Sequence, residues 1–482
     1  MEAIIYILIG IGATILSLVG IILIRTLRFK PKADIIYERE NVEVDGDKVI
    51  DNLAQLVRCR TVSDYDREKE DEAEFEKLIN LLPELYPHVY EKCTLTRMPD
   101  RALLYKYEGQ NHDAPSVLMA HYDVVPVKEE NWEKPPFDGI VENGVLWGRG
   151  TLDTKVTFAS ALYALDKLIG EGFIPENDIY LAFSGGEEVN GLGASHIVDY
   201  FEEKEIVPAM VLDEGGAVVE NVFPGVKAPC GLIGIAEKGF IDLEYKTKSN
   251  GGHASAPKPG SPLVRLADAC CRIEKHHFKR HLTAPVAGMF DTLGRHSSFL
   301  YRMIFANMWA FGGLLDVICK KSGGEINAMM RTTVAFTQAS GSSTSNVIPP
   351  EATLVSNIRL NPADTIDGAI KYLNDTIDCE EVELNVLRGI NPSRISTTDT
   401  DGYKRIEKAI KLTWDGTIVS PYLMVQCSDS RHWGRISDRV YRFSAMDLTS
   451  EERVTIHGNN ERIRVDCAKR AAEFYIRLIK QC

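Results

Sequence analysis

The chain has 482 residues, which is more than one hydrophobic core usually supports, so we expect two folded domains and an additional segment. Hydrophobic residues make up 44% of the chain and charged residues 26%, a composition that argues against extended disorder. The formal net charge of -14 repels phosphate backbones, and this argues against nucleic acid as a partner.

An uncharged apolar segment opens the chain. Residues 4–24 would form a helix roughly 30 Å long, enough to span the hydrocarbon core of a bilayer. A cleaved signal peptide would have a basic start and a shorter apolar run, whereas here the basic residues follow the run. They are Arg25, Arg28, Lys30 and Lys32. We therefore predict a single-pass membrane anchor over residues 1–31, and the positive-inside rule places the catalytic body in the cytoplasm.

A polar stretch over residues 32–47 is predicted to be a linker. The first part of the catalytic domain is predicted over residues 48–235, where short apolar runs alternate with helical patterns. The runs are 116–120, 178–183 and 209–212, and the helical patterns are 158–169 and 194–201. This order predicts an α/β fold with a central mixed, largely parallel sheet flanked by helices.

A second, smaller strand-rich unit is predicted over residues 236–390, because Ile241, Leu243 and Tyr245 alternate as in a half-exposed strand. Residues 391–482 are predicted to rejoin the first domain and end in a helix with one apolar face. Within the second unit, residues 290–317 are unusually apolar. We interpret them as a buried helical insert. The alternatives are an apolar cover over a substrate's acyl chain and a surface that enters the membrane.

Side chains that bind metals follow each of the three apolar runs. Because the carboxyl ends of parallel strands meet at one edge of a sheet, these side chains should lie close together. A single residue of this kind is usually a cap or a solvated side chain, but the joint placement indicates a site. The residues are His121 and Asp123 after the first run, Glu187 and Glu188 after the second, Asp213 after the third, and Asp153 in a glycine-rich loop before a helix.

So many carboxylates at short range cannot all stay ionised unless cations neutralise them. The pattern therefore predicts a dinuclear metal centre. Imidazole and carboxylate ligands without thiolates suit zinc, with manganese or cobalt as substitutes. Two ions roughly 3.5–4 Å apart are typical of aminopeptidase-like hydrolases.

Six motifs carry a resemblance to a known family. HYDVVPV, WGRGTLDTK, SGGEEVNG, LDEGG, NGGHASAP and IHGNNER resemble the motifs of the zinc-dependent exopeptidases. That family includes glutamate carboxypeptidase, aminoacylase, acetylornithine deacetylase and succinyl-diaminopimelate desuccinylase. The length, the N-terminal segment and the insert are most similar to its long branch, which contains Gly-Xaa carboxypeptidase S and N-fatty-acyl-amino-acid synthase/hydrolase. The resemblance covers about residues 48–480.

The resemblance implies a set of metal ligands. Asp153 would bridge two zinc ions, with His121 and Asp213 completing one site and Glu188 and His457 completing the other. His457 lies in the late IHGNNER motif, and spacing alone does not single it out.

The resemblance also implies catalytic and binding roles. Glu187 would be the general base that takes a proton from the attacking water and passes it to the leaving nitrogen, while Asp123 would orient His121. His253 would stabilise the oxyanion, often from the partner subunit of a homodimer, so the smaller unit is expected to be an α+β lid and dimerisation domain. Two residues match positions that hold the terminal carboxylate of a substrate, namely Asn346 and Arg359.

These features predict an enzyme that cleaves an amide or peptide bond next to a free carboxylate in a small-molecule substrate. A carboxypeptidase and an N-acyl-amino-acid hydrolase both fit, and the anchor and the apolar insert favour lipophilic, fatty-acyl substrates. A catalytically inactive binding protein on the same fold is disfavoured because every ligand position is filled. A serine hydrolase is disfavoured because the chain has no GxSxG motif.

Overall fold

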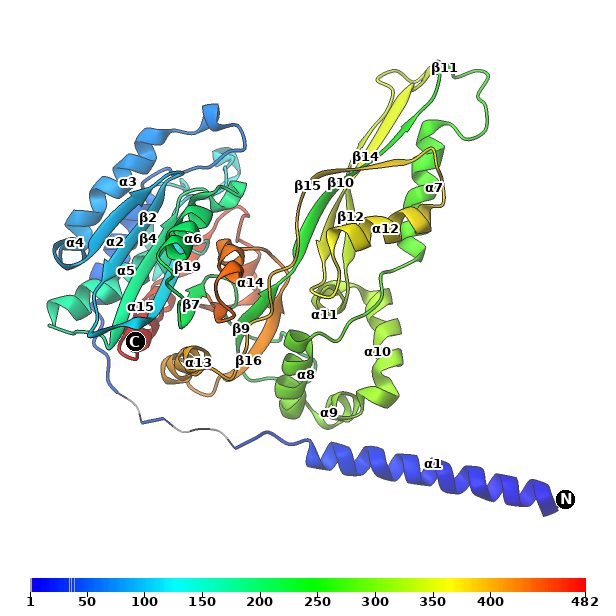
Figure 1. Ribbon diagram of the computed structural model, residues 1–482, viewed down its shortest axis with the longest axis horizontal. Helices are drawn as coiled ribbons and strands as arrows, with labels where there is room; N and C mark the ends of the chain where they lie inside the picture. Colours follow the sequence, from blue (N-terminus) through cyan, green and yellow to red (C-terminus); the bar gives the residue numbers. More distant parts are fainter. Residues whose placement is uncertain (1, 34, 36, 39) are drawn as a thin grey trace.

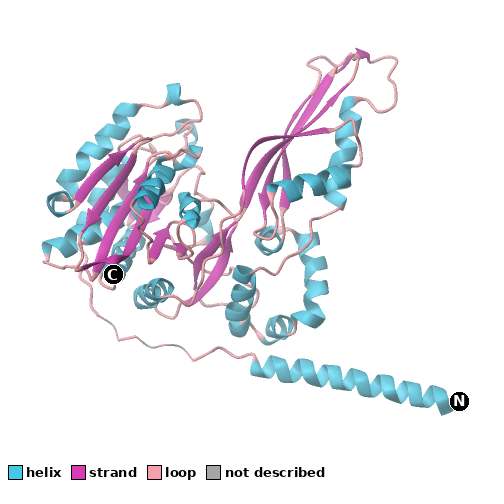
Figure 2. Cartoon of the chain, viewed as in Figure 1, coloured by secondary structure: helices cyan, strands magenta, loops and turns pink. Residues whose placement is uncertain are grey.

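The computed structural model describes residues 2–33, 35, 37–38 and 40–482. A larger and a smaller folded body follow an N-terminal helix (Figure 1). Helices flank the sheet of the larger body, and in the smaller body they lie to one side of the strands (Figure 2). Residues 1, 34, 36 and 39 of the predicted anchor and linker lie outside the described residues.

The N-terminal apolar segment forms one helix, α1 (Glu2–Arg28). Its most apolar window has a mean hydropathy of 2.8, and none of that window is buried. The helix is long and apolar enough to cross a membrane, although a signal sequence has the same properties. Figure 1 shows α1 extending away from both bodies, with its C-terminal end beside α9.

The larger body contains a ten-stranded mixed sheet, with the order β1-β2-β6-β3-β7-β17-β9-β8-β18 and with β16 paired to β9. The central strands β6, β3, β7 and β17 run parallel, while β1, β2 and β6 pair antiparallel. The predicted mixed α/β sheet is therefore confirmed. The strands are β1 (Thr94–Met98), β2 (Ala102–Tyr107), β3 (Asn111–His121), β6 (Asn177–Ser184), β7 (Met210–Asp213), β8 (Val218–Val219), β9 (Cys230–Glu237), β16 (Ile418–Met424), β17 (Val440–Arg442) and β18 (Asp447–Leu448).

Helices cover both faces of this sheet, which explains why its central strands are apolar throughout. In β6, Ile179, Leu181 and Phe183 face one core, and Tyr180 and Ala182 face the other. The first core is shared with α2 (Gly46–Val57), α3 (Glu72–Leu85), α4 (Pro87–Lys92), α5 (Lys155–Gly170), α13 (Asp401–Thr413) and α15 (Val465–Ile479), and the second with α6 (Gly193–Glu203). The helical patterns predicted over residues 158–169 and 194–201 correspond to α5 and α6.

The smaller body has a sheet and a core of its own. Four antiparallel strands lie in the order β12-β14-β10-β15, and two helices pack on one face. Along β10 the buried residues Ile241, Leu243 and Tyr245 alternate with more exposed ones, as predicted for a half-exposed strand. The elements are β10 (Gly239–Lys248), β12 (Thr333–Ser340), β14 (Glu351–Leu360), β15 (Glu383–Ile390), α7 (Pro262–Lys275) and α12 (Ile366–Ile377), with a short ladder of β11 (Gly252–His253) and β13 (Val347–Ile348) at the tip.

Residues 284–330, which contain the apolar insert at residues 290–317, form four helices: α8 (Ala284–His296), α9 (Phe299–Ala306), α10 (Met308–Ser322) and α11 (Gly324–Met330). Buried residues of α8, such as Met289 and Phe290, belong to the core of the larger body and not to that of the smaller one. Phe305 and Met329 join the same core from α9 and α11. The insert is nevertheless buried on one side only, because α9 and α10 expose large apolar side chains.

Candidate metal centre and active site

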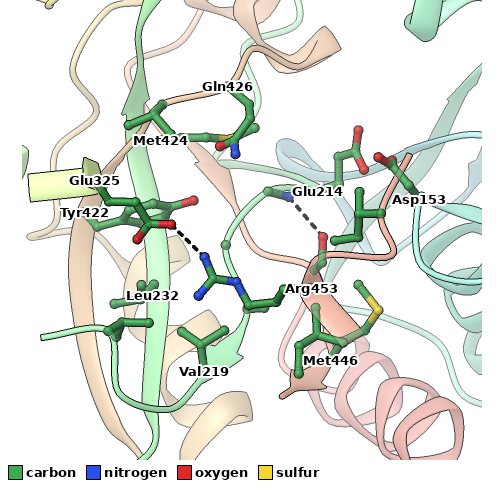
Figure 3. A pocket seen from close by; sticks show the side chains of 18 of the residues that line it. Asp153, Glu214, Val219, Leu232, Glu325, Tyr422, Met424, Gln426, Met446 and Arg453 are labelled. Carbon is green, nitrogen blue, oxygen red and sulfur yellow. Dashed lines mark hydrogen bonds and ion pairs between the residues drawn. The ribbon is translucent and has the colours of Figure 1, made fainter. Parts of the chain in front are cut away.

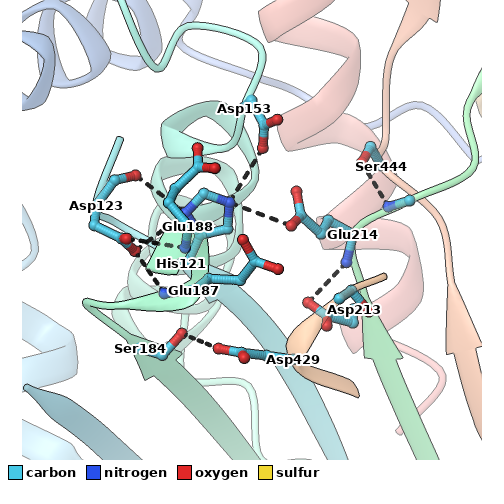
Figure 4. A network of polar contacts seen from close by, with 12 residues as sticks. His121, Asp123, Asp153, Ser184, Glu187, Glu188, Asp213, Glu214, Asp429 and Ser444 are labelled. Atoms are coloured by element: carbon cyan, nitrogen blue, oxygen red, sulfur yellow. Dashed lines mark hydrogen bonds and ion pairs between the residues drawn. The ribbon is translucent and has the colours of Figure 1, made fainter. Parts of the chain in front are cut away.

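The predicted ligands converge at the carboxyl ends of three neighbouring strands (Figure 4). His121 is the last residue of β3, Glu187 and Glu188 follow β6, and Asp213 is the last residue of β7. Since β3 pairs in parallel with both β6 and β7, the three strand ends meet at one edge of the sheet. Asp153 lies in the loop between β5 (Val145–Trp147) and α5.

Asp153 lies between two histidines. Its Oδ1 is 3.1 Å from His121 Nε2, and its Oδ2 is 2.9 Å from His457 Nε2. A glutamate approaches each histidine as well: Glu214 Oε1 lies 3.2 Å from His121 Nε2, and Glu188 Oε2 lies 3.2 Å from His457 Nε2. The side chains thus form two groups that share Asp153, which is the arrangement that a bridging carboxylate requires.

Asp213 does not join these groups. Its Oδ1 accepts a hydrogen bond from the backbone N–H of Glu214 and its Oδ2 accepts one from Ser430, both at 2.8 Å. Successive side chains at a strand end point in opposite directions, so only one of Asp213 and Glu214 can face His121. The structure places Glu214 there, in the position that the sequence analysis gave to Asp213.

Asp123 holds several parts of the centre in place. One carboxylate oxygen accepts the Ser63 hydroxyl at 2.7 Å, and the two oxygens accept the backbone N–H groups of Glu187 and Glu188 at 3.2 Å. His121 Nδ1 lies 3.0 Å from the Asp123 carbonyl oxygen and 3.4 Å from its Oδ1. These contacts orient the His121 ring and fix the turn that carries both glutamates.

The carboxylates of the centre are buried and crowded. Burial raises the pKa of Glu187 well above its usual range, and the nearby Asp429 and Glu188 carboxylates raise it further. Burial also raises the pKa of Glu214 to about 8, although His121 opposes the shift. Glu188 Oε1 is buried and has no hydrogen-bond partner among the described residues. Crowded carboxylates, imidazoles and an unpartnered oxygen fit bound divalent cations.

Two further residues, which the sequence analysis did not single out, position Asp153. Glu461 Oε1 accepts the backbone N–H groups of Leu152 at 2.7 Å and Asp153 at 3.2 Å, while Oε2 lies 2.6 Å from a guanidinium nitrogen of Arg149. Glu461 and Arg149 are both buried. The IHGNNER motif contains Glu461, but no pattern in the sequence pairs it with the loop of Asp153.

A cavity of about 690 Å³ opens from the centre (Figure 3). Asp153, Glu187 and Glu214 line one part of it, and Cys427 lines another. Most other lining side chains are apolar and come from β9, β16, α8, α11 and nearby loops. They include Val219, Leu232, Met289, Met329, Tyr422 and Met446.

The three predicted substrate-contacting residues lie in two places. Arg359, on β14, has a guanidinium nitrogen 3.6 Å from Cys427 Sγ, so it lies beside the cavity. His253 and Asn346 are exposed at the far tip of the smaller body, where the N–H of Ala254 donates to the Asn346 carbonyl oxygen. Figure 1 shows β11, which contains His253, at the end of this body away from the central sheet. One copy of the chain therefore brings Arg359 to the cavity, whereas its His253 and Asn346 lie at the far tip.

The family model of peptidase family M20/M25/M40 matches residues 117–481 of the chain. This chain belongs to the M20 family. An N-fatty-acyl-amino acid synthase/hydrolase PM20D1 of Xenopus tropicalis is 33% identical over 98% of the chain and 95% of its own length. A probable carboxypeptidase S-like 2 of Dictyostelium discoideum is 31% identical over 96% of the chain and 92% of its own length.

Solved structures have the same fold, among them one of an M20 family metallo-carboxypeptidase. The metallo-carboxypeptidase Sso-CP2 of Sulfolobus solfataricus superposes with a TM-score of 0.67 at 16% identity, over 90% of this chain and 98% of its own. Human carnosine dipeptidase 1 superposes with a TM-score of 0.62 at 13% identity, over 90% of this chain and 96% of its own. The predicted family and the zinc-exopeptidase-like fold are confirmed, and the protein is a metal-dependent hydrolase of the M20 family.

Proposed function

We propose that the protein is a dinuclear zinc hydrolase that cleaves N-acyl amino acids with a long acyl chain. The observation that carries this proposal is the cavity, which joins the metal centre to a wall of apolar side chains. Such a wall suits an acyl chain, while Arg359 beside Cys427 suits the free carboxylate of the amino acid. The relatives named N-fatty-acyl-amino acid synthase/hydrolase support the same substrate class.

We infer five metal ligands from the geometry. Asp153 is shared, His121 and Glu214 complete one site, and His457 and Glu188 complete the other. Glu214 thus replaces Asp213 in the predicted set. Zinc suits these ligands, and manganese or cobalt would substitute. When bound, the metal ions supply Lewis acidity that activates water and polarises the scissile carbonyl.

The side chains of the protein perform the remaining steps. Glu187, whose carboxylate lies within 4.8 Å of the His121 and Glu214 ligand atoms, takes a proton from the attacking water and delivers it to the leaving nitrogen. The raised pKa of Glu187 suits both roles, because the same carboxyl group must accept and then donate a proton. Arg359 holds the carboxylate of the substrate, so the scissile bond is presented beside Glu187.

A homodimer would complete the site. His253 and Asn346 lie together at the tip of the smaller body, too far from the centre of their own chain to act there. We propose that the tip of one subunit reaches the cavity of the other, where His253 stabilises the oxyanion and Asn346 assists Arg359 in binding the carboxylate.

We also propose that α1 is a single-pass anchor and that its basic C-terminal flank lies in the cytoplasm with the catalytic body.

The second candidate is a carboxypeptidase that releases a C-terminal residue. The carboxypeptidase S-like relative favours it, and the same metals, base and arginine would serve both reactions. The two functions differ in the acyl group that fills the cavity.

The test compares kcat/KM of the zinc-loaded full-length protein on N-oleoyl amino acids and on Gly-Xaa dipeptides, with Glu187→Gln as the control. We expect faster turnover of the N-oleoyl substrates and a loss of activity of about 10²-fold or more in Glu187→Gln. Faster dipeptide turnover would favour the carboxypeptidase. Activity that survives Glu187→Gln would contradict the mechanism, and activity on neither substrate would contradict the proposed substrate class.

A further inference from the structure

The outward surface of helices α9 and α10 is apolar. On α10, Trp309 and Leu314 are each 57% exposed, and Val317 and Ile318 are each 50% exposed. Trp309, Leu314 and Val317 are five and three positions apart and Ile318 follows directly, so the four residues share one side of the helix. A helix that faces water normally carries charged residues on this side, but here Lys320 and Lys321 follow only at its end. With Phe299, Leu300 and Tyr301 of α9, these four residues form what we call the α9–α10 face.

The turn between α9 and α10 lies beside the last turns of α1. The side-chain amide of Asn307, between α9 and α10, donates to the Ile22 carbonyl oxygen and to Thr26 Oγ1, both at 3.2 Å. The Arg25 guanidinium donates to the Ala306 carbonyl oxygen at 3.1 Å. Thr26 is 1% exposed, so this contact is tightly packed. The apolar run of α1 extends to residue 24, which places the turn between α9 and α10 where that run ends.

Contacts of α8 fix the basic flank of α1 as well. The Arg295 guanidinium donates to the Lys30 carbonyl oxygen at 3.1 Å and lies 4.4 Å from the centroid of the Phe29 ring. Lys32 forms an ion pair with Asp291 at 3.4 Å. Basic side chains at the end of a membrane helix lie at the level of the lipid headgroups. These contacts therefore hold the insert at the depth where α1 leaves the membrane.

We propose that the α9–α10 face is a second membrane contact, which lies in the bilayer interface beside α1. This inference rests on the proposed anchoring role of α1. Together α9 and α10 are as apolar as a membrane span, but they are bent by 110° at Asn307. The 15 residues of α10 would measure only about 22 Å, less than the roughly 30 Å of a hydrocarbon core. A bent, one-sided apolar pair fits a helix hairpin that lies on the membrane and does not cross it.

The helices that precede and follow α9 and α10 form part of the wall of the catalytic cavity. Met289 of α8 and Met329 of α11 line the cavity, and α9 and α10 connect these two helices. The membrane contact and the cavity wall are therefore parts of one segment. The α9–α10 face would bring the cavity to substrates that are dissolved in the bilayer, which are amphiphiles with an acyl chain and a carboxylate head. Delivery from the membrane adds to the proposed function, because the reaction itself does not require it.

The first test uses Trp309 as a probe of the membrane. The full-length protein is reconstituted into phosphatidylcholine vesicles with or without bromine on the acyl chains, and tryptophan emission is compared between wild type and Trp309→Phe. We expect brominated lipids to quench a component of the emission that Trp309→Phe lacks. Equal quenching in wild type and Trp309→Phe would overturn the proposal. A second result would also overturn it: Trp309 is not quenched, and the protein self-associates in a way that Leu314→Glu abolishes. The face would then contact a second copy of the chain and not the membrane.

The second test separates membrane delivery from the reaction. Val317→Glu is compared with Val207→Glu, a matched control because Val207 is 55% exposed on the larger body and lies between α6 and β7. For N-oleoyl amino acids in vesicles, we expect kcat/KM to fall about tenfold in Val317→Glu only. Both variants should keep the wild-type rate on a water-soluble N-acetyl amino acid. Unchanged turnover of vesicle substrate in Val317→Glu, or equal losses on both substrates, would overturn the inference. Wild-type protein that cleaves neither substrate would instead refute the proposed function, and the Trp309 quenching would still report on the face.

Discussion

The adjacent residues Asp213 and Glu214 allow a direct test of the inferred ligand set. Glu214→Gln keeps the size of the side chain but removes the charge that lies 3.2 Å from His121. We expect this variant to lose one of two bound zinc equivalents and most of its activity, because a neutral amide is a poor ligand for zinc. Asp213→Asn, by contrast, should keep both zinc equivalents, since its carboxylate faces the backbone of Glu214 and Ser430.

The expected loss in Asp213→Asn follows from its two hydrogen bonds. Each carboxylate oxygen accepts one backbone N–H at 2.8 Å, and an Asn side chain retains one such acceptor. Its amino group would then face an N–H donor. A hydrogen bond to a charged group is worth about 1.5–3 kcal/mol, so a loss of about 2 kcal/mol is expected. If all of this loss appears as misplacement of Glu214, kcat/KM falls about 30-fold.

The assay measures zinc content and kcat/KM of both variants and the wild type after equilibration with a zinc buffer. We expect Glu214→Gln to lose far more than 30-fold in kcat/KM together with one zinc equivalent, and Asp213→Asn to stay near 30-fold with full zinc content. The reverse result, in which Asp213→Asn loses zinc and Glu214→Gln keeps it, would refute our assignment of Glu214. It would restore Asp213 as the ligand.

Three other predictions concern stability. Glu461→Ala leaves the buried Arg149 guanidinium without its carboxylate partner, so the free energy of unfolding, measured in urea, should fall by about 3–5 kcal/mol. A change below about 1 kcal/mol would contradict the stabilising role of this ion pair. Burial lowers the pKa of Lys238 from 10.5 to about 7, so between these pH values the unfolded chain binds more protons than the folded one. The free energy of unfolding should therefore rise with pH across this window in the wild type but not in Lys238→Met. Parallel pH profiles of the two unfolding midpoints would contradict it. Because the folded, metal-free protein holds Glu214 with a pKa of about 8 against an ordinary pKa of 4.5, its stability should fall as pH rises through this window. The decrease in the unfolding midpoint that follows metal chelation should therefore become larger as pH rises. A decrease that is the same at every pH would contradict the raised pKa of Glu214.

Much of the fold was predictable because the central strands are buried on both faces. Continuous apolar runs bounded by helical patterns identify β3, β6 and β7, and the rule that ligands gather beyond parallel strand ends brings His121 and Glu188 together. The smaller unit was predictable from the alternation along β10. His457 was reached only through the resemblance, since it lies on a loop with positive φ, far from any of these strands in sequence.

Other features depend on contacts that no local pattern contains. Asp213, the last residue of β7, turns its carboxylate towards the backbone N–H of Ser430, more than 200 residues later in the chain. This distant contact leaves Glu214 to face His121. The pairing of Glu461 with the loop of Asp153 is equally distant in sequence. The apolar composition of residues 290–317 predicted a helical insert, but composition does not separate side chains that enter the core from those that remain exposed. Phe290 and Phe305 are buried, whereas Phe299 is 45% exposed.

Lys238 connects the parts of the molecule that would contact a substrate. It lies between β9 of the larger body and β10 of the smaller one, and its Nζ donates to the carbonyl oxygens of Ala328 and Arg331 at 2.8 and 2.9 Å. These carbonyls flank the end of α11, which carries Met329 into the cavity. If the smaller body closes over the centre, the backbone must change direction next to Lys238, between β9 and β10. Arg359 would then move relative to the apolar wall, because Met289, Met329 and Met446 of the wall belong to the core of the larger body. The distance between the carboxylate and the acyl chain that the cavity accepts would therefore depend on this movement.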